Sequence, residues 1–475
     1  MVFSSVIFLC FFLPCVLFLY FLSARKYKNS ILLVASIFFY SWGGPKFIFV
    51  ILITTALDYI LANQIYRAKK YKLLFLIISL SLNVSLLFYF KYSNFFIDNV
   101  NALFNWFGIS QFASVAEIAL PIGISFYTFE SITYSVDVYR GQHKPLNSFF
   151  DYLLYILFFP KLIAGPIIRY HEIEGQLTNR FDSDNINNKI NGLFRFFIGL
   201  AKKVLIANVL AEQADKIFEL PISDLDTLTA WSGALLYTFQ IYFDFSGYSD
   251  MALGLALVFG FKLSENFNNP YISKSITEFW RRWHITLGNW MKNYLYIPLG
   301  GNKVKSRSRL FFNLWLVFVC SGFWHGANWT FIVWGVFHGL LLIMDRLFYL
   351  KLSQKIPSFI SVGITFILVV IGWVLFRSET ISKAMSYLQT MFSFKDYGNF
   401  IYYFEPKVVF TIAYAFIFSF IWYTGKMQNL QNRILFEAPG KSGVVLKTVI
   451  GAILFVVCLG ALVSNNFNPF IYFRF

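Results

Sequence analysis

An ionisable histidine at a glycine-flanked bend between two apolar runs constrains this chain more than any other feature. The runs cover Leu310 to Cys320 and Thr330 to Met344, and the nine residues SGFWHGANW between them carry His325. A helix from Leu310 to Trp324 would rise about 22 Å, against a hydrocarbon core of about 30 Å. We therefore expect His325 inside the membrane, where a titratable side chain indicates a functional site unless it only joins helices by a hydrogen bond.

Composition sets the fold class. Hydrophobic residues make up 57% of the 475 residues and charged residues only 13%, which is typical of a polytopic membrane protein. We predict an all-α fold with about ten to twelve membrane helices, plus re-entrant and interfacial helices around a central cavity, in one integral-membrane domain over residues 1–475. The first span, about Val2 to Leu22, has no basic residue before it and is expected to remain as an anchor.

The net charge of +16 falls in short clusters between apolar runs, which predicts membrane topology and argues against a nucleic-acid partner. Because such clusters face the cytoplasm and the first one follows the first span, that span must start on the other side. The N-terminus is therefore predicted outside the cytoplasm. Basic residues also precede the last span, Val449 to Val463, so the aromatic tail 465–475 is expected outside as well. The clusters are Arg25, Lys26 and Lys28; Arg67, Lys69, Lys70 and Lys72; Lys303 to Arg309; and Lys426, Arg433, Lys441 and Lys447.

Several apolar segments are poor candidates for simple spans. Ile118 to Tyr134 contains a proline, a glycine and Glu130, and Phe158 to Tyr170 contains two prolines and two basic residues. Irregular backbone at membrane depth persists only when it is buried in protein or lines a watery cavity, so we expect re-entrant elements here. The longest polar stretch, Glu172 to Lys189, is predicted to be an exposed loop.

A second histidine lies in the stretch Thr277 to Tyr294, which mixes tryptophans with basic residues and is typical of an amphipathic interfacial helix. Arg281, Arg282 and Trp283 precede His284. One interpretation makes these three an ordinary interfacial anchor. The other makes them a cytoplasmic site for an anionic, phosphate-bearing donor.

Asp244 and Asp250 are candidate acids within an apolar run. Either carboxylate could neutralise a basic residue or orient a catalytic imidazole. No histidine or cysteine spacing predicts a metal site, and no G-x-S-x-G motif predicts a serine hydrolase. General acid–base chemistry by histidine in a membrane cavity remains.

Five stretches, in order along the central third of the chain, carry a resemblance to the membrane-bound O-acyltransferases, and within them to bacterial alginate O-acetylases and peptidoglycan O-acetyltransferases. They are Phe159–Arg169 (FPKLIAGPIIR), Tyr242–Asp250 (YFDFSGYSD), Phe279–Leu287 (FWRRWHITL), Tyr296–Asn302 (YIPLGGN) and Gly322–Ala327 (GFWHGA).

The resemblance implies acyl transfer from a cytoplasmic donor, acetyl-CoA, towards an extracytoplasmic polysaccharide such as alginate or peptidoglycan, with no bound cofactor. It makes His325 the family's central histidine and His284 a second functional histidine nearer the cytoplasm. His338 is kept as a supporting polar residue. It further implies a multi-pass protein in the inner membrane of a bacterium, in contact with membrane lipid.

The tail Phe470 to Phe475 resembles the terminal motif of small proteins that accompany D-alanyl transferases of teichoic acid. Under this hypothesis Tyr472 enters the cavity, takes an acetyl group on its phenolic oxygen and passes it to a partner's serine. The alternative is an aromatic anchor at the membrane interface. Because the sequence shows no soluble domain for a polysaccharide, the resemblance implies a separate periplasmic esterase-like acetyltransferase as partner.

Two other functions stay open at this point. A D-alanyl transferase would use the same histidines, but it would need a carrier protein and a separate partner that bears the tail. A secondary transporter would also contain broken helices and buried charge, but it should show paired interruptions in two related halves, and the sequence shows none.

Overall fold

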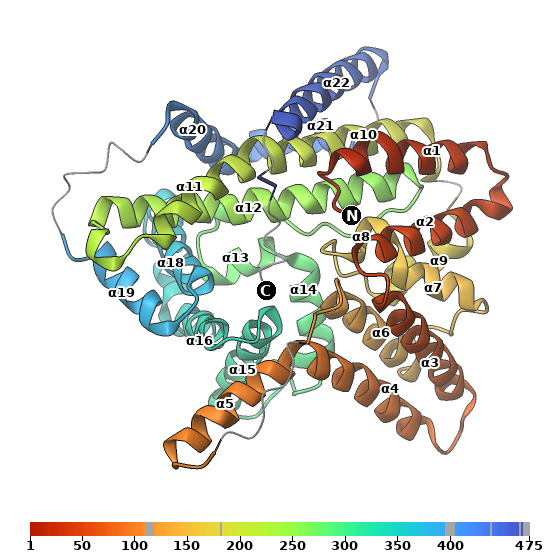
Figure 1. Cartoon of the computed structure of the whole chain (residues 1–475), viewed down its shortest axis with the longest axis horizontal. Coiled ribbons are helices and arrows are strands. Elements are labelled where there is room, and N and C mark those ends of the chain that lie inside the picture. The colour runs from red at the N-terminus through yellow and green to blue at the C-terminus, as the bar shows by residue number, and fades with distance from the viewer. Residues whose placement is uncertain (111–117, 181–182, 395–403, 438, 465–466, 469–475) are drawn as a thin grey trace. The chain divides into compact units, whose positions relative to one another are not determined.

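The computed structural model describes residues 1–110, 118–180, 183–394, 404–437, 439–464 and 467–468, and every regular element within them is helical (Figure 1). The chain forms two compact units. One comprises residues 1–184 and 259–264, and the other comprises residues 185–258 and 265–475. The predicted all-α membrane architecture is confirmed for the described residues.

The first unit is built from helices α1 to α9. Within it α3 packs against α4 and α6, and α2 packs against α1 and α7. Residues 259–264 return to this unit after α12, where the Tyr20 hydroxyl donates to the Phe259 carbonyl. The helices are α1 (Leu13–Leu22), α2 (Lys28–Gly43), α3 (Phe47–Arg67), α4 (Lys72–Leu87), α5 (Ser93–Trp106), α6 (Ile124–Tyr139), α7 (Phe149–Leu157), α8 (Phe159–Leu162) and α9 (Tyr170–Thr178).

The two irregular segments expected from the sequence pack against each other in the first unit. The turn before α6 needs Gly123, whose φ is +76° and where a Cβ would lie 2.6 Å from the Leu162 carbonyl oxygen. Lys161 of the four-residue helix α8 forms a buried ion pair with Glu130 of α6. A buried charge needs such a partner, so this pair ties the short helix to α6.

The expected loop from Glu172 to Lys189 is wrong at both ends. Residues up to Thr178 belong to α9, at whose start the backbone N–H and the guanidinium of Arg169 both donate to the Glu172 carboxylate, and the residues from Ile186 belong to α10 (Ile186–Ala201). Ile173 and Leu177 lie one turn apart and are both buried. Two apolar residues at this spacing anchor one face of a helix, and the polar residues around them obscure that short pattern.

The second unit contains α10 to α22, with α10 and α11 lying along the long helix α12 (Figure 1). Its helices are α10 (Ile186–Ala201), α11 (Asn208–Glu219), α12 (Thr227–Val258), α13 (Ile276–Arg282), α14 (Ile285–Met291), α15 (Arg307–His325), α16 (Trp329–Met344), α17 (Leu350–Leu352), α18 (Ser358–Arg377), α19 (Ile381–Met391), α20 (Pro406–Phe420), α21 (Gly425–Leu435) and α22 (Lys441–Ser464).

Glycines let α10 and α12 approach at backbone contact. A Cβ at Gly192 would lie 2.6 Å from the Gly254 carbonyl oxygen, and a Cβ at Gly199 would lie 2.5 Å from that of Gly247. Small residues allow this approach between membrane helices. A π-helical segment, Lys202–Ala207, joins α10 to α11 beside this contact.

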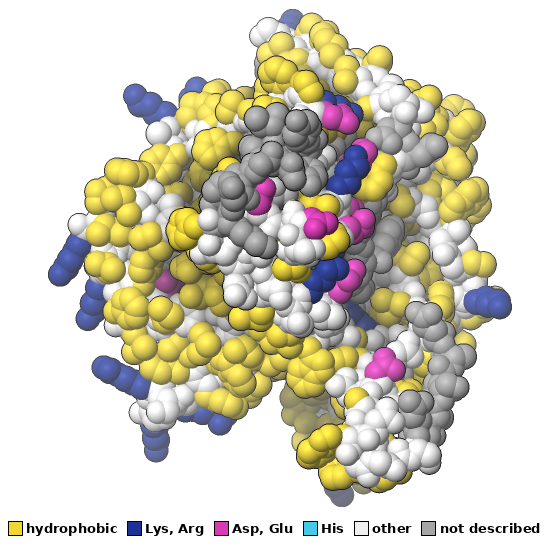
Figure 2. Space-filling model, turned by 60° about the vertical axis from the view of Figure 1, so that its left-hand side comes forward, with side chains coloured by type: hydrophobic (Ala, Val, Ile, Leu, Met, Phe, Trp, Pro, Cys, Tyr) yellow, Lys and Arg dark blue, Asp and Glu magenta, His cyan; other side chains and the backbone are white. Residues whose placement is uncertain are grey.

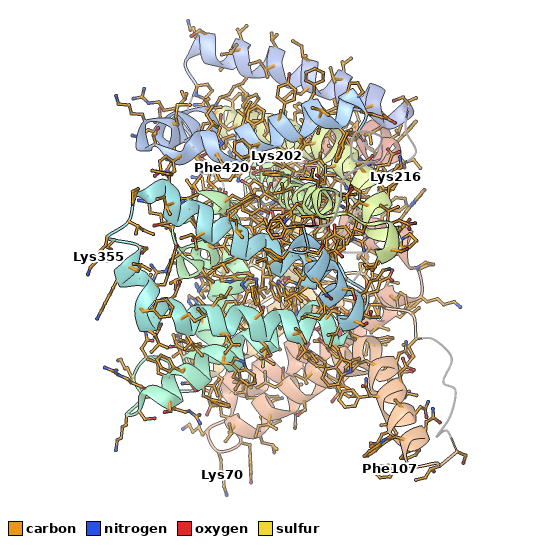
Figure 3. The ribbon with its side chains drawn as sticks, turned by 90° about the vertical axis from the view of Figure 1, so that its left-hand side faces the viewer. Lys70, Phe107, Lys202, Lys216, Lys355 and Phe420 are labelled. Atoms are coloured by element: carbon orange, nitrogen blue, oxygen red, sulfur yellow. The ribbon has the colours of Figure 1, made fainter. Side chains whose placement is uncertain are left out.

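Six helical stretches of the described chain are long and apolar enough to span a membrane: residues 47–67, 72–106, 329–352, 358–377, 406–423 and 441–464. The shorter apolar helix Phe8–Leu22 covers the expected first span. Hydrophobic side chains cover much of the face in Figure 2. Figure 3 shows Lys70 and Lys355 projecting from the ends of helices, where positive charge is expected beside membrane spans.

The helices α15 and α16 form a tight hairpin around the bend that the sequence predicted. A Cβ at Gly322 would lie 2.2 Å from the Phe331 carbonyl oxygen, and a Cβ at Gly335 would lie 2.4 Å from that of Phe318. The side chain of Asn328 accepts from the Thr330 N–H and so caps α16. Backbone contact and a satisfied helix start together fix the position of the bend.

We predict that Gly335→Ala destabilises the protein by roughly 2 kcal/mol or more, since an added methyl group cannot fit beside the Phe318 carbonyl. Gly363→Ala on α18 is the matched control, because nothing lies within 4 Å of a Cβ at that position. Thermal unfolding in detergent should show a lower midpoint for the first variant and an unchanged or higher midpoint for the second. Equal midpoints would contradict close packing of the hairpin.

Candidate active site

His325 is the last residue of α15, at the bend of the hairpin. Its side chain is 8% exposed. Three aromatic rings surround it, with centroids 4.9 Å away for Trp324 and 5.3 Å away for both Trp334 and Phe376. The structure thus places the imidazole in an aromatic enclosure at the end of a long helix, as its position in the sequence suggested.

His284 breaks the stretch that the sequence predicted to be one amphipathic helix. Its φ is +45°, in the left-handed region, and it separates α13 from α14. A residue other than glycine seldom takes this conformation, and such positions cluster at functional sites. The helix expected from Thr277 to Tyr294 is therefore two short helices and a π-helical turn, Lys292–Tyr296, because the left-handed backbone at His284 interrupts it.

Asn266 holds this break in place. Its side-chain Oδ1 lies 3.1 Å from His284 Nδ1, 3.3 Å from the Thr286 backbone nitrogen and 2.9 Å from the Thr286 hydroxyl. Its own carbonyl accepts from the Ile285 N–H at 2.9 Å. The backbone N–H groups of Ile285 and Thr286 begin α14 and have no intrahelical partners, so Asn266 acts as their cap.

The same contacts determine which nitrogen of His284 carries hydrogen. A backbone N–H can only donate, so the Asn266 atom facing Thr286 is the oxygen and not the amide nitrogen. That oxygen can only accept, and His284 Nδ1 must therefore donate to it. In the neutral ring Nε2 then has the free lone pair of a base.

His284 Nε2 is buried and has no hydrogen-bond partner among the residues that the structure describes. The side chain is 2% exposed, and burial lowers the pKa of His284 to about 3. The imidazole is consequently neutral at physiological pH. A ring with so low a pKa is a weak base, but its unoccupied nitrogen can accept a hydrogen bond from a bound ligand.

Two tryptophans lie between the three histidines of this unit. The Trp324 ring contacts His284 at 6.3 Å and His325 at 4.9 Å between centroids. The Trp334 ring contacts His325 at 5.3 Å and His338 at 5.0 Å. The structure therefore gathers residues that are up to 54 positions apart in the sequence into one aromatic cluster.

His338 has a packing role in this cluster. Its Nδ1 accepts a hydrogen bond from Trp280 Nε1–H at 3.4 Å. A Cβ at Gly372 of α18 would lie 2.7 Å from His338 Nε2. The ring is thus fixed between α13 and α18, which fits the supporting position that the resemblance implied.

A pocket of about 390 Å³ lies beside His284 within the second unit. Arg281, Lys292 and Arg346 line it and are exposed, and Ser321 lines it one helical turn before His325. The Arg346 guanidinium donates to Asn302 Oδ1 at 3.1 Å, which joins the end of α16 to the loop before α15. The pocket therefore combines a cationic opening with a buried histidine.

Two of the three residues that the sequence proposed for donor binding are placed elsewhere. The side chain of Arg282 pairs with Glu278 at 2.9 Å and donates to the Asn268 carbonyl. Trp283 is buried among aromatic rings, including Trp373 at 4.8 Å between centroids. Of the three, only Arg281 lines the pocket, because alternate residues around the end of α13 face different directions.

The two aspartates serve as counter-ions. Asp244 pairs with Lys203 at 2.6 Å, and Asp250 pairs with Lys202 at 2.7 Å and with Arg195 at 2.8 Å. Both lysines lie on the π-helical segment before α11. His284 is oriented by an amide and not by either carboxylate. No cluster of three metal-ligating side chains occurs in the described ranges, and Tyr472 lies outside those ranges.

Comparison with known proteins identifies the family of the chain. The model of the family described as MBOAT, membrane-bound O-acyltransferase family, matches residues 37–375, which include both His284 and His325. This chain belongs to the membrane-bound O-acyltransferase family.

Three curated relatives lie in the bacterial part of that family. The probable alginate O-acetylase of Pseudomonas putida is 40% identical over all of both chains. That of Pseudomonas aeruginosa is 45% identical over 83% of this chain and 75% of its own length. The peptidoglycan O-acetyltransferase of Helicobacter pylori is 39% identical over 82% of this chain and 80% of its own. The chain is thus a membrane-embedded O-acyltransferase.

Sequence reasoning did not find Asn266 in this O-acyltransferase. It lies 18 residues before His284 in the run SENFNNP, where nothing in spacing or composition separates it from its neighbours Asn268 and Asn269. The place of Arg346 in the pocket was also missed, because it lies 54 residues after Lys292, one of the basic residues of the predicted interfacial stretch, and only the fold brings the two to one pocket.

We predict that Asn266→Ala lowers acyl transfer by roughly tenfold, about the worth of one hydrogen bond, since His284 loses the acceptor that fixes its tautomer and keeps Nε2 free to accept from a bound ligand. Thr286→Val is the matched control, because it deletes one donor to Asn266 and leaves the His284 bond in place. Acyl-transfer rates of purified, monodisperse variants measure the effect. If both variants lose activity equally, Asn266 acts only through folding.

Proposed function

We propose that this protein takes acetyl groups from acetyl-CoA bound at the cytoplasmic side. It passes them across the membrane for the O-acetylation of an extracytoplasmic polysaccharide. The observation that carries the proposal is the buried, unprotonated Nε2 of His284 beside a pocket with a cationic opening. A thioester donor with phosphate groups needs both features. The phosphates need cations, and the end of the donor that carries the thioester needs a dry site with a polar group that can orient it.

The cations favour a donor that enters from the cytoplasm. Arg346 follows α16, and the basic cluster Lys303 to Arg309 precedes α15. The end of α16 and the start of α15, beside the pocket, therefore both carry positive charge. By the positive-inside rule this side faces the cytoplasm. Arg281, Lys292 and Arg346 would then receive the phosphates while the acyl end lies towards His284 and Ser321.

The hairpin supports transfer towards the opposite face. From Arg307 to His325, α15 rises about 27 Å, close to the thickness of the hydrocarbon core. His325 therefore lies at the end of the helix remote from the basic cluster. We assign it the role of general base for the acceptor hydroxyl, in line with the resemblance.

The proposed chemistry requires no metal or redox step. His325 takes the proton of an acceptor hydroxyl while that oxygen attacks the thioester carbonyl. The tetrahedral intermediate collapses, the carbon–sulfur bond breaks, and the thiolate of coenzyme A leaves and takes up a proton. His284, as a neutral acceptor, orients the donor through Nε2.

The first acceptor is proposed to be Tyr472 of the tail. The last described residue before it, Asn468, accepts a hydrogen bond from Asn208 at the start of α11, at 3.1 Å. This contact holds the chain against the second unit four residues before the tyrosine. A phenolic acetyl ester would then pass its acetyl group to the serine of a periplasmic esterase-like partner, which completes transfer to the glycan.

The class of glycan follows from the relatives alone. Those named above act, by their names, on alginate and on peptidoglycan, and both names specify O-acetyl transfer. We therefore favour acetyl over D-alanyl as the transferred group. An acidic or amino-sugar polysaccharide outside the inner membrane is the proposed final acceptor.

We predict that Arg281→Gln raises the KM for acetyl-CoA by roughly fivefold to tenfold, because a charge-assisted contact contributes about 1–1.4 kcal/mol at a partly exposed site. Arg282→Gln is the neighbouring control, since this side chain pairs with Glu278 and does not line the pocket. Initial rates of coenzyme A release at varied donor concentration separate KM from kcat. An equal rise in both variants would place the donor elsewhere.

His325→Ala should leave membrane insertion intact and lower transfer by roughly 10²–10⁴-fold. The assay incubates the purified protein with radiolabelled acetyl-CoA and maps label on the polypeptide by mass spectrometry, in the wild type and in Tyr472→Phe. Label on Tyr472 of the wild type that is lost in both variants supports the relay. Full labelling of His325→Ala would exclude His325 as the base, and an absence of wild-type label and of donor hydrolysis would exclude acetyl-CoA.

A further inference from the structure

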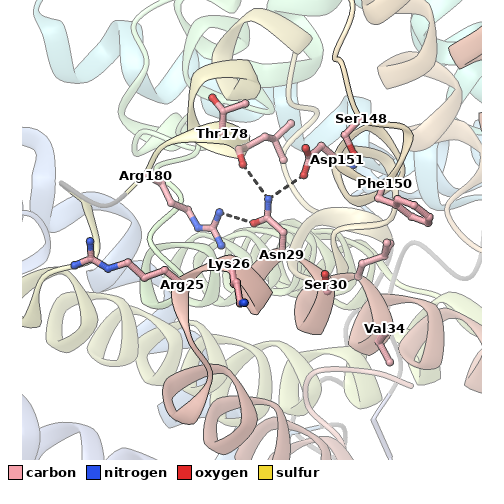
Figure 4. A pocket seen from close by; sticks show the side chains of 12 residues that line it. Arg25, Lys26, Asn29, Ser30, Val34, Ser148, Phe150, Asp151, Thr178 and Arg180 are labelled. Carbon is pink, nitrogen blue, oxygen red and sulfur yellow. Dashed lines mark hydrogen bonds between the residues drawn. The ribbon is translucent and has the colours of Figure 1, made fainter.

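The turn between α1 and α2 contains a pocket that the proposed reaction does not use. It has a volume of about 900 Å³ and lies wholly within the first unit, between the start of α2, the start of α7 and the end of α9 (Figure 4). Arg25 and Lys26 stand at its edge, on the short 3₁₀ turn Arg25–Tyr27, and both are exposed. The pocket thus begins at the first basic cluster of the chain.

Its polar floor is held together by hydrogen bonds. The Asn29 amide donates to Asp151 at 3.0 Å and to the Leu177 carbonyl at 2.9 Å, and its oxygen accepts from Arg180 at 2.6 Å (Figure 4). The pocket is therefore lined by one carboxylate, that of Asp151, and by three cationic side chains, those of Arg25, Lys26 and Arg180. The excess of positive charge favours an anionic ligand at the edge, and the bonded floor gives it a rigid base.

An apolar groove continues from the same place. It has a volume of about 890 Å³, runs between α1 and α2, and shares Ser30 and Val34 with the polar pocket. Cys15 and Leu19 line it from α1, and Phe38 and Trp42 line it from α2. From Ser30 to Trp42 the helix rises about 18 Å, which matches the hydrocarbon depth of one leaflet, about 15 Å.

We propose that this composite site binds one anionic glycerophospholipid of the cytoplasmic leaflet. Its phosphate would lie at Arg25 and Lys26, and one acyl chain would follow the α1–α2 groove from Val34 towards Trp42. The order of features along the hairpin carries the assignment. Cations come first, at the membrane interface where the first positive cluster lies, and a groove one leaflet deep follows without interruption.

A lipid fits this order better than other occupants. A soluble anion would use the cationic edge alone, and a second protein chain would need more than a groove between two helices to be recognised. An amphiphile with a negative head and an apolar chain uses both parts at once.

The test is native mass spectrometry of the full-length protein released from nanodiscs that contain equal amounts of phosphatidylglycerol and phosphatidylethanolamine. The wild type should retain phosphatidylglycerol in preference. Retention should fall about fivefold for each cation removed in Arg25→Gln and Lys26→Gln. Lys69→Gln with Lys70→Gln is the matched control, because this pair belongs to the next basic turn and does not line the pocket.

A second variant tests the groove. Val34 is 67% exposed, so Val34→Trp fills the groove without entering the protein core, and it should displace the lipid. Val84→Trp on α4, where the side chain is 54% exposed, is its control. Each test variant is compared with its control by lipid retention and not by acetyl transfer. A negative result would therefore count against the lipid site and not against the proposed function.

The outcomes separate the alternatives. Loss of lipid in both the charge and the groove variants, with normal retention in both controls, supports the site. Equal retention of the two lipids, or unchanged retention in Val34→Trp, overturns it. Release of phosphatidylglycerol by millimolar inorganic phosphate would show that the edge binds a free anion instead of a lipid.

Discussion

A charge buried in an apolar surrounding needs a partner, and this constraint shapes both units of the protein. In the first unit the Glu130–Lys161 pair joins a four-residue helix to α6. In the second unit Lys203 and Lys202 pair with Asp244 and Asp250, so that a π-helical segment is held against α12. Irregular backbone occurs at these places because the paired side chains hold it there.

The candidate active site is built from different contacts. His284 bonds to an amide, and indole and phenyl rings pack against His325. A carboxylate in place of the Asn266 amide would favour the imidazolium form of His284, which cannot accept a hydrogen bond. The amide fixes the orientation of the ring and leaves it neutral. Asp244 and Asp250 pair with lysines and an arginine instead.

The sequence predicted the parts of the fold that depend on apolar patterns and single residues. The all-α class and the hairpin around His325 are present, and the irregular backbone expected at 158–170 lies on either side of the short helix α8. The expected irregular segment 118–134 is wrong from Ile124 onward, because α6 begins there and irregular backbone is confined to residues 118–123. The loop from Glu172 was wrong because two buried residues were too few to show a helical period. The break at His284 escaped notice because it depends on hydrogen bonds from Asn266, and no local pattern encodes a partner 18 residues away. Membrane orientation and the role of Tyr472 stay predictions.

The glycine contacts of the hairpin limit how such a protein can work. With carbonyl oxygens of one helix pressed against the glycines of the other, α15 cannot slide or tilt past α16 without separating from it. A transporter carries its cargo by rocking whole bundles about a central site. In this hairpin the two helices are held in close contact, so under the proposed function the acetyl group would be handed between acceptors while α15 and α16 stay in place.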